Sequence, residues 1–124
     1  MTPGELLASA RDLIGRPGAA AAGVWPRTAA LLARQALEAA VDAQWAASAE
    51  TAGLVRATQR SQLICLPCYA DPAVARQLAF TYAALSGACH FHPYELAPTA
   101  AELSRWITDV ETLLAQLAPG TRSP

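Results

Sequence analysis

The chain has 124 residues, the size of one domain with a single hydrophobic core. Hydrophobic residues make up 53% of it and charged residues 15%, a composition that excludes an intrinsically disordered chain. The net charge of −1 gives no overall attraction to nucleic acid, and we expect no DNA partner. No apolar run reaches the roughly 18–20 residues that cross a bilayer, so we expect no membrane association.

The beginning of the chain, MTPGELLASARDLIG, holds acidic residues and no long apolar run, so it does not have the pattern of a secretion signal. The chain contains three cysteines, and without an export signal such cysteines are typical of reduced thiols in the cytosol. The sequence therefore predicts a cytoplasmic protein.

Signals for helix starts and ends follow one another along the chain. Thr2 and Glu5 have the spacing of a capping box, which predicts a short helix that ends at Gly15. After a loop rich in small residues, Pro26 opens a long helix whose apolar residues recur at helical spacing. These signals predict two helices in the first 50 residues.

Two further helices are predicted in the middle of the chain. One covers 54–66 and ends at Pro67. The next begins at Asp71 and Pro72, a cap followed by a first-turn proline, and ends before Pro93. The stripe of this helix that we expect to face the core is Val74, Leu78, Tyr82, Leu85 and Cys89.

The same helix carries a second stripe made of small residues, Ala79, Ala83, Ser86 and Gly87. Small side chains let another helix approach closely. Together with the high apolar content of the chain, this stripe favours a homodimer.

The last helix is predicted to begin at the capping box formed by Thr99 and Glu102, and its apolar residues follow the 3.6-residue period up to Leu117. No segment alternates in the manner of a strand. We therefore predict an all-α, four- to five-helix up-and-down bundle. It forms a single helical domain over 1–124, with a short N-terminal helix at 1–15, a core at about 26–117 and a frayed tail at 119–124.

The stretch LSGACHFHPYEL, at 85–96, is the densest group of side chains that can bind metal or move protons. It contains both histidines of the chain, His90 and His92, followed by Tyr94 and Glu95. A histidine at the end of a helix also fits a purely structural role, because the macrodipole favours it there and it can bond free carbonyls. The residues alone leave both interpretations open.

A zinc site is one alternative for this stretch. The pair CLPC (Cys65 and Cys68) and the run CHFH (Cys89, His90 and His92) offer the ligand types that zinc takes tetrahedrally. However, each group ends one helix of an antiparallel pair, so we expect the two groups to lie about 20 Å apart. No metal and no cofactor are therefore expected.

Three features together resemble a HEPN domain: the segment AALLARQALEAAVDA, a helix that ends YAALSGACHFH, and an amphipathic closing helix. The resemblance covers about residues 26–117. It implies a small helical bundle that dimerises and is HEPN-like in fold. Many HEPN domains are metal-independent ribonucleases of toxin–antitoxin and phage-defence systems. Their signature is an arginine, a spacer of four to six residues and a histidine near a helix end, with two copies meeting across the dimer.

The chain departs from that signature because no arginine lies four to six residues before His90. The cation would have to come from another helix, with Arg60, Arg56 and Arg34 as candidates, or from a second subunit. In a ribonuclease, His90 and His92 would act as base and acid, and Tyr94 and Glu95 would orient a ring nitrogen.

We therefore expect a degenerate, non-catalytic HEPN-like module that dimerises or binds an RNA or protein partner in a prokaryotic defence or toxin–antitoxin-type system. The first alternative is a metal-independent ribonuclease with His90 and Arg60 in its site. The second alternative is the small zinc-binding protein.

Overall fold

The computed structural model describes residues 1–15, 25–90 and 97–117. All regular structure in these ranges is helical, which confirms the predicted all-α class. The elements are α1 (Pro3–Gly15), α2 (Trp25–Ala46), η2 (Ala52–Arg56), α3 (Gln59–Cys65), η3 (Leu66–Cys68), α4 (Pro72–Cys89) and α5 (Ala100–Leu117), where η marks a 3₁₀ helix.

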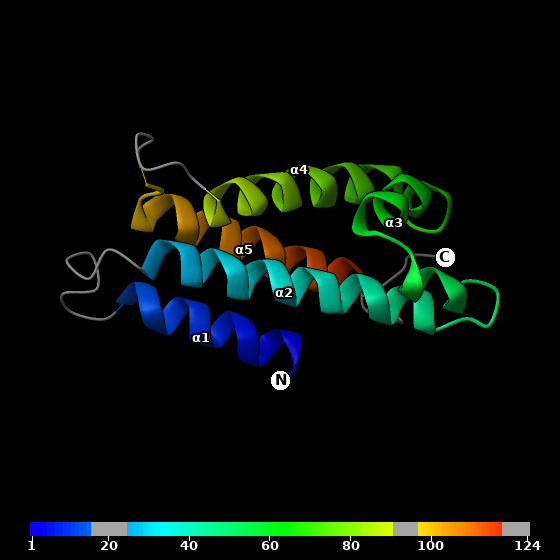
Figure 1. Ribbon diagram of the computed structural model, residues 1–124, viewed down its shortest axis with the longest axis horizontal. Coiled ribbons are helices and arrows are strands. Elements are labelled where there is room, and N and C mark those ends of the chain that lie inside the picture. The colour runs from blue at the N-terminus through cyan, green and yellow to red at the C-terminus, as the bar shows by residue number, and fades with distance from the viewer. Residues whose placement is uncertain (16–24, 91–96, 118–124) are drawn as a thin grey trace.

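The four long helices run in alternating directions, as an up-and-down bundle does (Figure 1). Helices α2 and α5 each contact the other three, and α1 and α4 lie on opposite sides of this central pair. The short α3 lies beside the N-terminal end of α4, next to the C-terminal end of α2. The exposed flank of α4 and the two ends of the bundle are therefore the places where this fold can present a site.

Local capping determines where the helices begin. The side chain of Thr2 accepts a hydrogen bond from the backbone N–H of Glu5 at 3.1 Å. Thr99 and Glu102 each accept from the other's backbone N–H at 3.1 Å, which completes a reciprocal capping box. Asp71 Oδ1 accepts from the backbone N–H two residues later at 2.7 Å. All three predicted caps are confirmed.

The predicted helix over 54–66 is divided in two, which corrects the sequence interpretation. Thr58 has an extended backbone (φ −63°, ψ 155°), and its side chain caps the start of α3. The side chain of Gln62 is fully buried, and its amide nitrogen donates to the carbonyls of Leu54 at 2.9 Å and Ala57 at 3.1 Å. This amide satisfies carbonyls that a continuous helix would have bonded internally, so the break is stable.

The core lies between α1, α2, α4 and α5, and Leu78 and Leu85 of α4 are fully buried in it, as predicted. Three other members of the predicted stripe, Val74, Tyr82 and Cys89, are only half-buried. Val74 lines a groove towards α5, whereas Tyr82 and Cys89 lie on the side of α4 that approaches charged residues of α2. The buried stripe of α4 is completed by small residues and a threonine: Ala75, Thr81 and Ala88.

Candidate functional site

His90 follows the last residue of α4 and ends the helix. Its backbone (φ −124°, ψ 23°) has left the helical region, and its N–H donates to the carbonyl of Gly87 at 3.2 Å. Its side chain is exposed to solvent. The prediction that the helix ends before Pro93 is confirmed, because its last residue is Cys89. The predicted site residues His92, Tyr94 and Glu95 lie outside the described residues.

Arg60, the cation predicted to serve His90, is exposed on α3. Helix α3 lies beside the N-terminal end of α4, and His90 follows the C-terminal end (Figure 1). Helix α4 has 18 residues and is therefore about 27 Å long. A single copy of the chain does not bring Arg60 and His90 together, and an arginine from a second copy stays a prediction.

Arg34 of α2 is the arginine that acts on the C-terminal end of α4. It is half-buried, and its Nε lies 3.6 Å from Glu38 Oε1, one helical turn away. Burial raises the pKa of the Cys89 thiol, while the positive charge of Arg34 opposes that rise. Cys89 directly precedes His90, so this pair of helices brings a cation into the neighbourhood of the predicted histidine.

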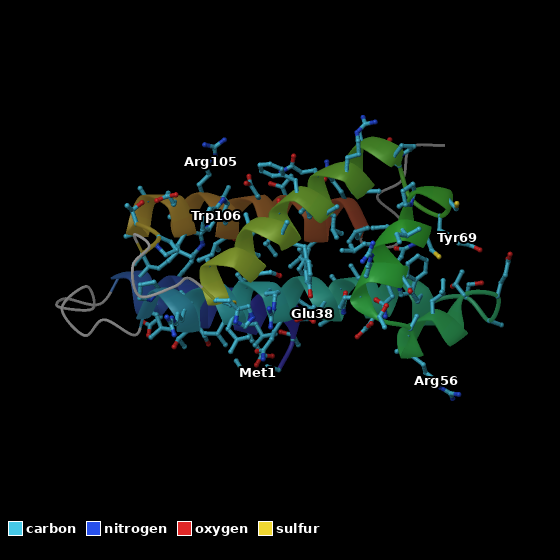
Figure 2. The ribbon with its side chains drawn as sticks, turned by 45° about the horizontal axis from the view of Figure 1, so that its top comes forward. Met1, Glu38, Arg56, Tyr69, Arg105 and Trp106 are labelled. Carbon is cyan, nitrogen blue, oxygen red and sulfur yellow. The ribbon has the colours of Figure 1, made fainter. Side chains whose placement is uncertain are left out.

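The charged residues of α2 and the polar residues of α4 form a seam between the two helices, which we call the α2–α4 seam: Arg34, Glu38 and Asp42 from α2, and Tyr82, Ser86 and Cys89 from α4. Figure 2 labels Glu38, which lies near the middle of α2. All six residues are partly buried.

Burial is the main cause of the shifted pKa values in the α2–α4 seam. It raises the pKa of Glu38, an effect that Arg34 opposes and the charge of Asp42 reinforces. Burial also raises the pKa of Tyr82, and the charge of Glu38 adds to this rise. The seam contains one guanidinium group and two carboxyl groups, so it offers no excess of cationic groups to a phosphate.

The cysteines and histidines of the predicted zinc site are spread along α4. Cys65 and Cys68 precede this helix and Cys89 ends it, so its length of about 27 Å separates them. All three cysteines are free thiols. Among the described residues, no three potential ligands gather around a common point. His92 lies outside those residues.

The surface of α4 that points away from the bundle holds two members of the predicted small-residue stripe, Ala83 and Gly87, whereas Ala79 and Ser86 are half-buried. Its members, which we call the outer α4 face, are Arg76, Phe80, Ala83 and Gly87. Phe80 is 69% exposed, and a Cβ added at Gly87 would meet nothing within 4 Å. Arg76 is the sole charged residue in the 18 residues of α4. That scarcity of charge is the sequence signal that could have revealed this face.

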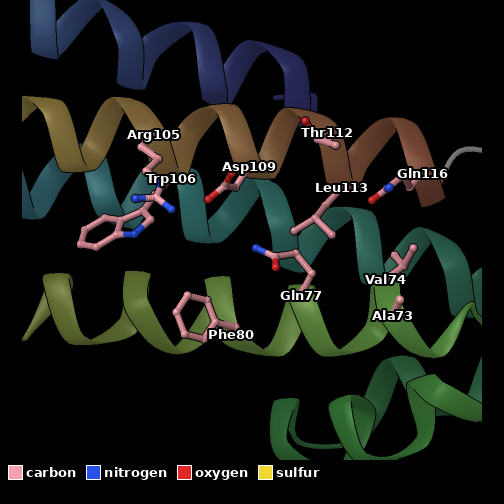
Figure 3. Close-up of a pocket in the computed structure, with 10 residues that line it drawn as sticks. All are labelled: Ala73, Val74, Gln77, Phe80, Arg105, Trp106, Asp109, Thr112, Leu113 and Gln116. Atoms are coloured by element: carbon pink, nitrogen blue, oxygen red, sulfur yellow. The ribbon is translucent and has the colours of Figure 1, made fainter.

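A groove of about 580 Å³ lies between α4 and α5, beside the outer α4 face (Figure 3). Phe80 projects from α4 and Trp106 from α5 at the same end of the groove, and Val74 and Leu113 line it further along. Arg105 is among the polar residues that line the α5 side. Phe80 therefore belongs both to the outer α4 face and to the edge of an open groove.

No family model, curated protein or solved structure matches the chain. None of the helices in the described ranges is long and apolar enough to cross a membrane. The function is therefore argued from the geometry of the chain itself.

Proposed function

We propose that this chain is a HEPN-like helical module that acts by association and pairs with a second copy of itself. It would be a non-catalytic component of the prokaryotic defence or toxin–antitoxin-type systems that the resemblance implies. The observation that carries the proposal is the composition of the outer α4 face, where one exposed phenylalanine and two small residues accompany a single charge.

A helix that is apolar on all sides is normally covered on all sides. Helix α4 has α2 and α5 on its inner side and solvent on its outer side. Ala83 and Gly87 would allow the backbone of a second helix to come close, and Phe80 would supply the apolar area to be buried.

A two-fold axis beside Ala83 and Ala84 would cover the outer α4 face of both copies, because the same contact forms once on each side of the axis. In an antiparallel crossing of two α4 helices, Phe80 of each copy would lie opposite Gly87 of the other copy. The phenylalanine ring of one copy would thus fill the space that the glycine of the other copy leaves, since glycine has no side chain. Such a self-complementary contact is the usual form of a homodimer interface.

The charges of the candidate site also support association over catalysis. RNA cleavage without a metal requires a cation beside the phosphate. Arg34 is neutralised by Glu38, and Arg60 lies at the other end of α4 from His90 within one chain. In a single copy, neither of these two predicted arginines is therefore an unpaired cation beside His90.

The mass of the protein in solution tests the proposal, by sedimentation or light scattering at micromolar concentration. We expect the wild type to be a dimer, and Phe80→Glu to be a monomer because a charge would be buried at the contact. Gly87→Leu should also be a monomer, although its own fold should gain roughly 0.5–1 kcal/mol of helix stability.

Ala115→Lys is the matched control. Ala115 is an exposed helical alanine on α5, and it lies one turn beyond Glu111, which pairs with α1 rather than α4. This variant should remain dimeric. A monomeric wild type, or dimers that survive both α4 substitutions, would refute association through the outer α4 face.

A second candidate function, metal-independent RNA cleavage, is favoured by one observation: His90 is exposed directly after Cys89, on which Arg34 acts. The test is cleavage of a labelled RNA in excess EDTA by the wild type, His90→Ala and Arg34→Gln. Cleavage that disappears in His90→Ala would establish this activity. Absence of cleavage by the dimeric wild type would leave association as the function.

A further inference from the structure

The groove between α4 and α5 is lined in equal parts by apolar and by polar residues (Figure 3). Its volume of about 580 Å³ lies within the range that is usual for small-molecule sites. Residues 73–80 of α4 form one wall, and residues 105–116 of α5 form the other. The two helices run in opposite directions, so side chains that are far apart in the sequence meet around this one space.

The apolar part of the groove consists of a floor and two aromatic rings. Leu113 is fully buried and Val74 is half-buried, and both belong to the floor. At one end Trp106 projects from α5 and Phe80 projects from α4 (Figure 3). Trp106 is half-buried, whereas most of Phe80 is in solvent. A flat aromatic group that enters this end contacts rings from both helices.

The polar part of the groove holds a pair of opposite charges on α5. Arg105 and Asp109 are one helical turn apart, and both line the groove. Among the described residues, neither side chain has a hydrogen-bond or ion-pair partner. An arginine that precedes its acidic partner by four residues is also in the weaker orientation for pairing along a helix. Both charged groups are therefore open to a ligand.

The neighbouring charges in the described ranges are engaged elsewhere or point away. Glu102 accepts a hydrogen bond from the backbone N–H of Thr99 at 3.1 Å, and Asp71 caps the start of α4. Arg76 belongs to the outer α4 face and does not line the groove. The lining therefore carries one positive group, one negative group and no net charge.

We propose that this groove binds a free aromatic α-amino acid. The carboxylate of the ligand pairs with Arg105 and its ammonium group pairs with Asp109, while its ring packs against Trp106 and Phe80. The two charged groups of an α-amino acid are attached to one carbon atom, and side chains one turn apart on a helix have about 5–6 Å between their Cβ atoms. A single ligand of this class can therefore reach both charges.

Other classes of ligand use fewer of these groups. A single-stranded nucleic acid needs a track of several cations, and the groove has one arginine. A hydrocarbon would leave the polar half of the lining without partners. An organic cation would use Asp109 and the two rings, but it would be repelled by Arg105. The lining thus favours a ligand with both charges and an aromatic side chain.

This site goes beyond the proposed association and does not rest on it. Arg105, Trp106 and Asp109 lie on α5, outside the outer α4 face. Phe80 belongs to both places, so a change at Phe80 would alter two properties at once. Variants of α5 separate them, because they should weaken ligand binding and leave the mass of the protein in solution unchanged.

Isothermal titration calorimetry of the full-length chain with L-phenylalanine tests the site, and amide NMR spectra locate it. We expect saturable binding that shifts the amide signals of α4 and α5 beside the groove. Three related compounds each lack one feature: L-alanine has no ring, N-acetyl-L-phenylalanine has no ammonium group, and L-phenylalaninamide has no carboxylate. Each should bind more weakly than L-phenylalanine by about tenfold or more.

Asp109→Asn and Arg105→Gln should each weaken the binding of L-phenylalanine by about tenfold or more. Arg76→Gln is the matched control, because Arg76 is an exposed arginine that does not line the groove, and it should bind as the wild type does. Circular dichroism checks that each variant keeps its fold.

Two results would reveal a site for cations and overturn the proposal: L-phenylalaninamide that binds as tightly as L-phenylalanine, or Arg105→Gln that binds more tightly than the wild type. Equal binding of all four compounds, or no binding of L-phenylalanine at millimolar concentration, would overturn it as well.

Discussion

Helices α4 and α5 have the same length, 18 residues, and both pack against α2. They differ in how many charged residues they carry on the sides that face away from the core. Helix α5 buries one stripe, which includes Leu103 and Ile107, and carries four charged residues on its other sides. Helix α4 buries an equivalent stripe and carries one charged residue. The orientation of α5 can therefore be read from its own pattern, whereas α4 has a second apolar side that one chain leaves uncovered.

The two sides of α4 are expected to have different roles, the inner side in folding stability and the outer side in the proposed association. The inner side of each helix contributes to the free energy of unfolding, because burial of apolar surface drives folding. The outer α4 face contributes nothing comparable in one copy, since Phe80 stays in water. The proposed contact with a second copy would account for its composition.

The largest expected effect comes from truncating the inner side of α4. Leu85 is fully buried, so Leu85→Ala should lower the free energy of unfolding by about 2–5 kcal/mol. Phe80→Ala should change it by less than about 0.5 kcal/mol in the dissociated chain. Urea unfolding at low protein concentration measures both values. Equal losses would show that α4 has no distinct outer side.

Capping is expected to give an intermediate effect in both helices. Thr99→Ala removes the acceptor of the capping box of α5, and Asp71→Ala removes the single cap bond of α4. Each should cost about 1 kcal/mol, as measured by thermal unfolding. If Asp71→Ala costs nothing, the start of α4 is held by packing alone, which would widen the contrast between the two helices.

A smaller effect is expected from the pH dependence of the α2–α4 seam. Burial raises the pKa of Glu38 above its ordinary value of 4.5, so the folded chain holds this proton more tightly than the unfolded chain. The resulting stability is present below pH 4.5 and is lost as the pH rises through the folded pKa.

Glu38→Gln serves as the reference in this experiment because it cannot titrate. As the pH rises above 4.5, the wild type should lose stability relative to Glu38→Gln, by less than about 1 kcal/mol because the pair is partly screened by water. Chemical unfolding across this range measures the difference. A wild type that gains stability relative to the variant would show that Arg34 outweighs burial.

The smallest effect leaves stability unchanged and concerns thiol reactivity. Cys68 is exposed on η3, whereas Cys89 is half-buried and burial raises its pKa. At pH 8 Cys89 should therefore react with iodoacetamide more slowly than the exposed Cys68, because burial raises the pKa of Cys89 and limits access to its sulfur. Mass spectrometry of peptides over time gives the two rates, and Cys68→Ser identifies the fast one. A faster Cys89 would mean that the α2–α4 seam is open to solvent.

The parts of the fold that were predictable depend on neighbours in sequence. The caps at Thr2, Asp71 and Thr99 each involve residues within three positions, and the period of α5 needs only its own residues. The break at Thr58 was missed because it depends on the side chain of Gln62 reaching back to η2. That hydrogen bond forms only when α3 packs against η2.

The candidate site was predictable to the same limited extent. The end of α4 at His90 follows from local signals, and it was found. Which arginine lies near that end depends on how the helices pair, and this placed Arg34, not Arg60, on the side of Cys89. The exposure of Phe80 was missed because α4 has few charged residues, so its sequence pattern does not distinguish the buried side from the exposed side.

The buried amide of Gln62 has a consequence for how the molecule opens. A helix of seven residues does not hold itself together in water, and α3 is attached to η2 by this one side chain. Loss of these hydrogen bonds should therefore loosen η2 and α3 together while the four long helices stay folded. The backbone amides of α3 should exchange with deuterium before those of α2 and α5, so this end of the bundle can open without global unfolding.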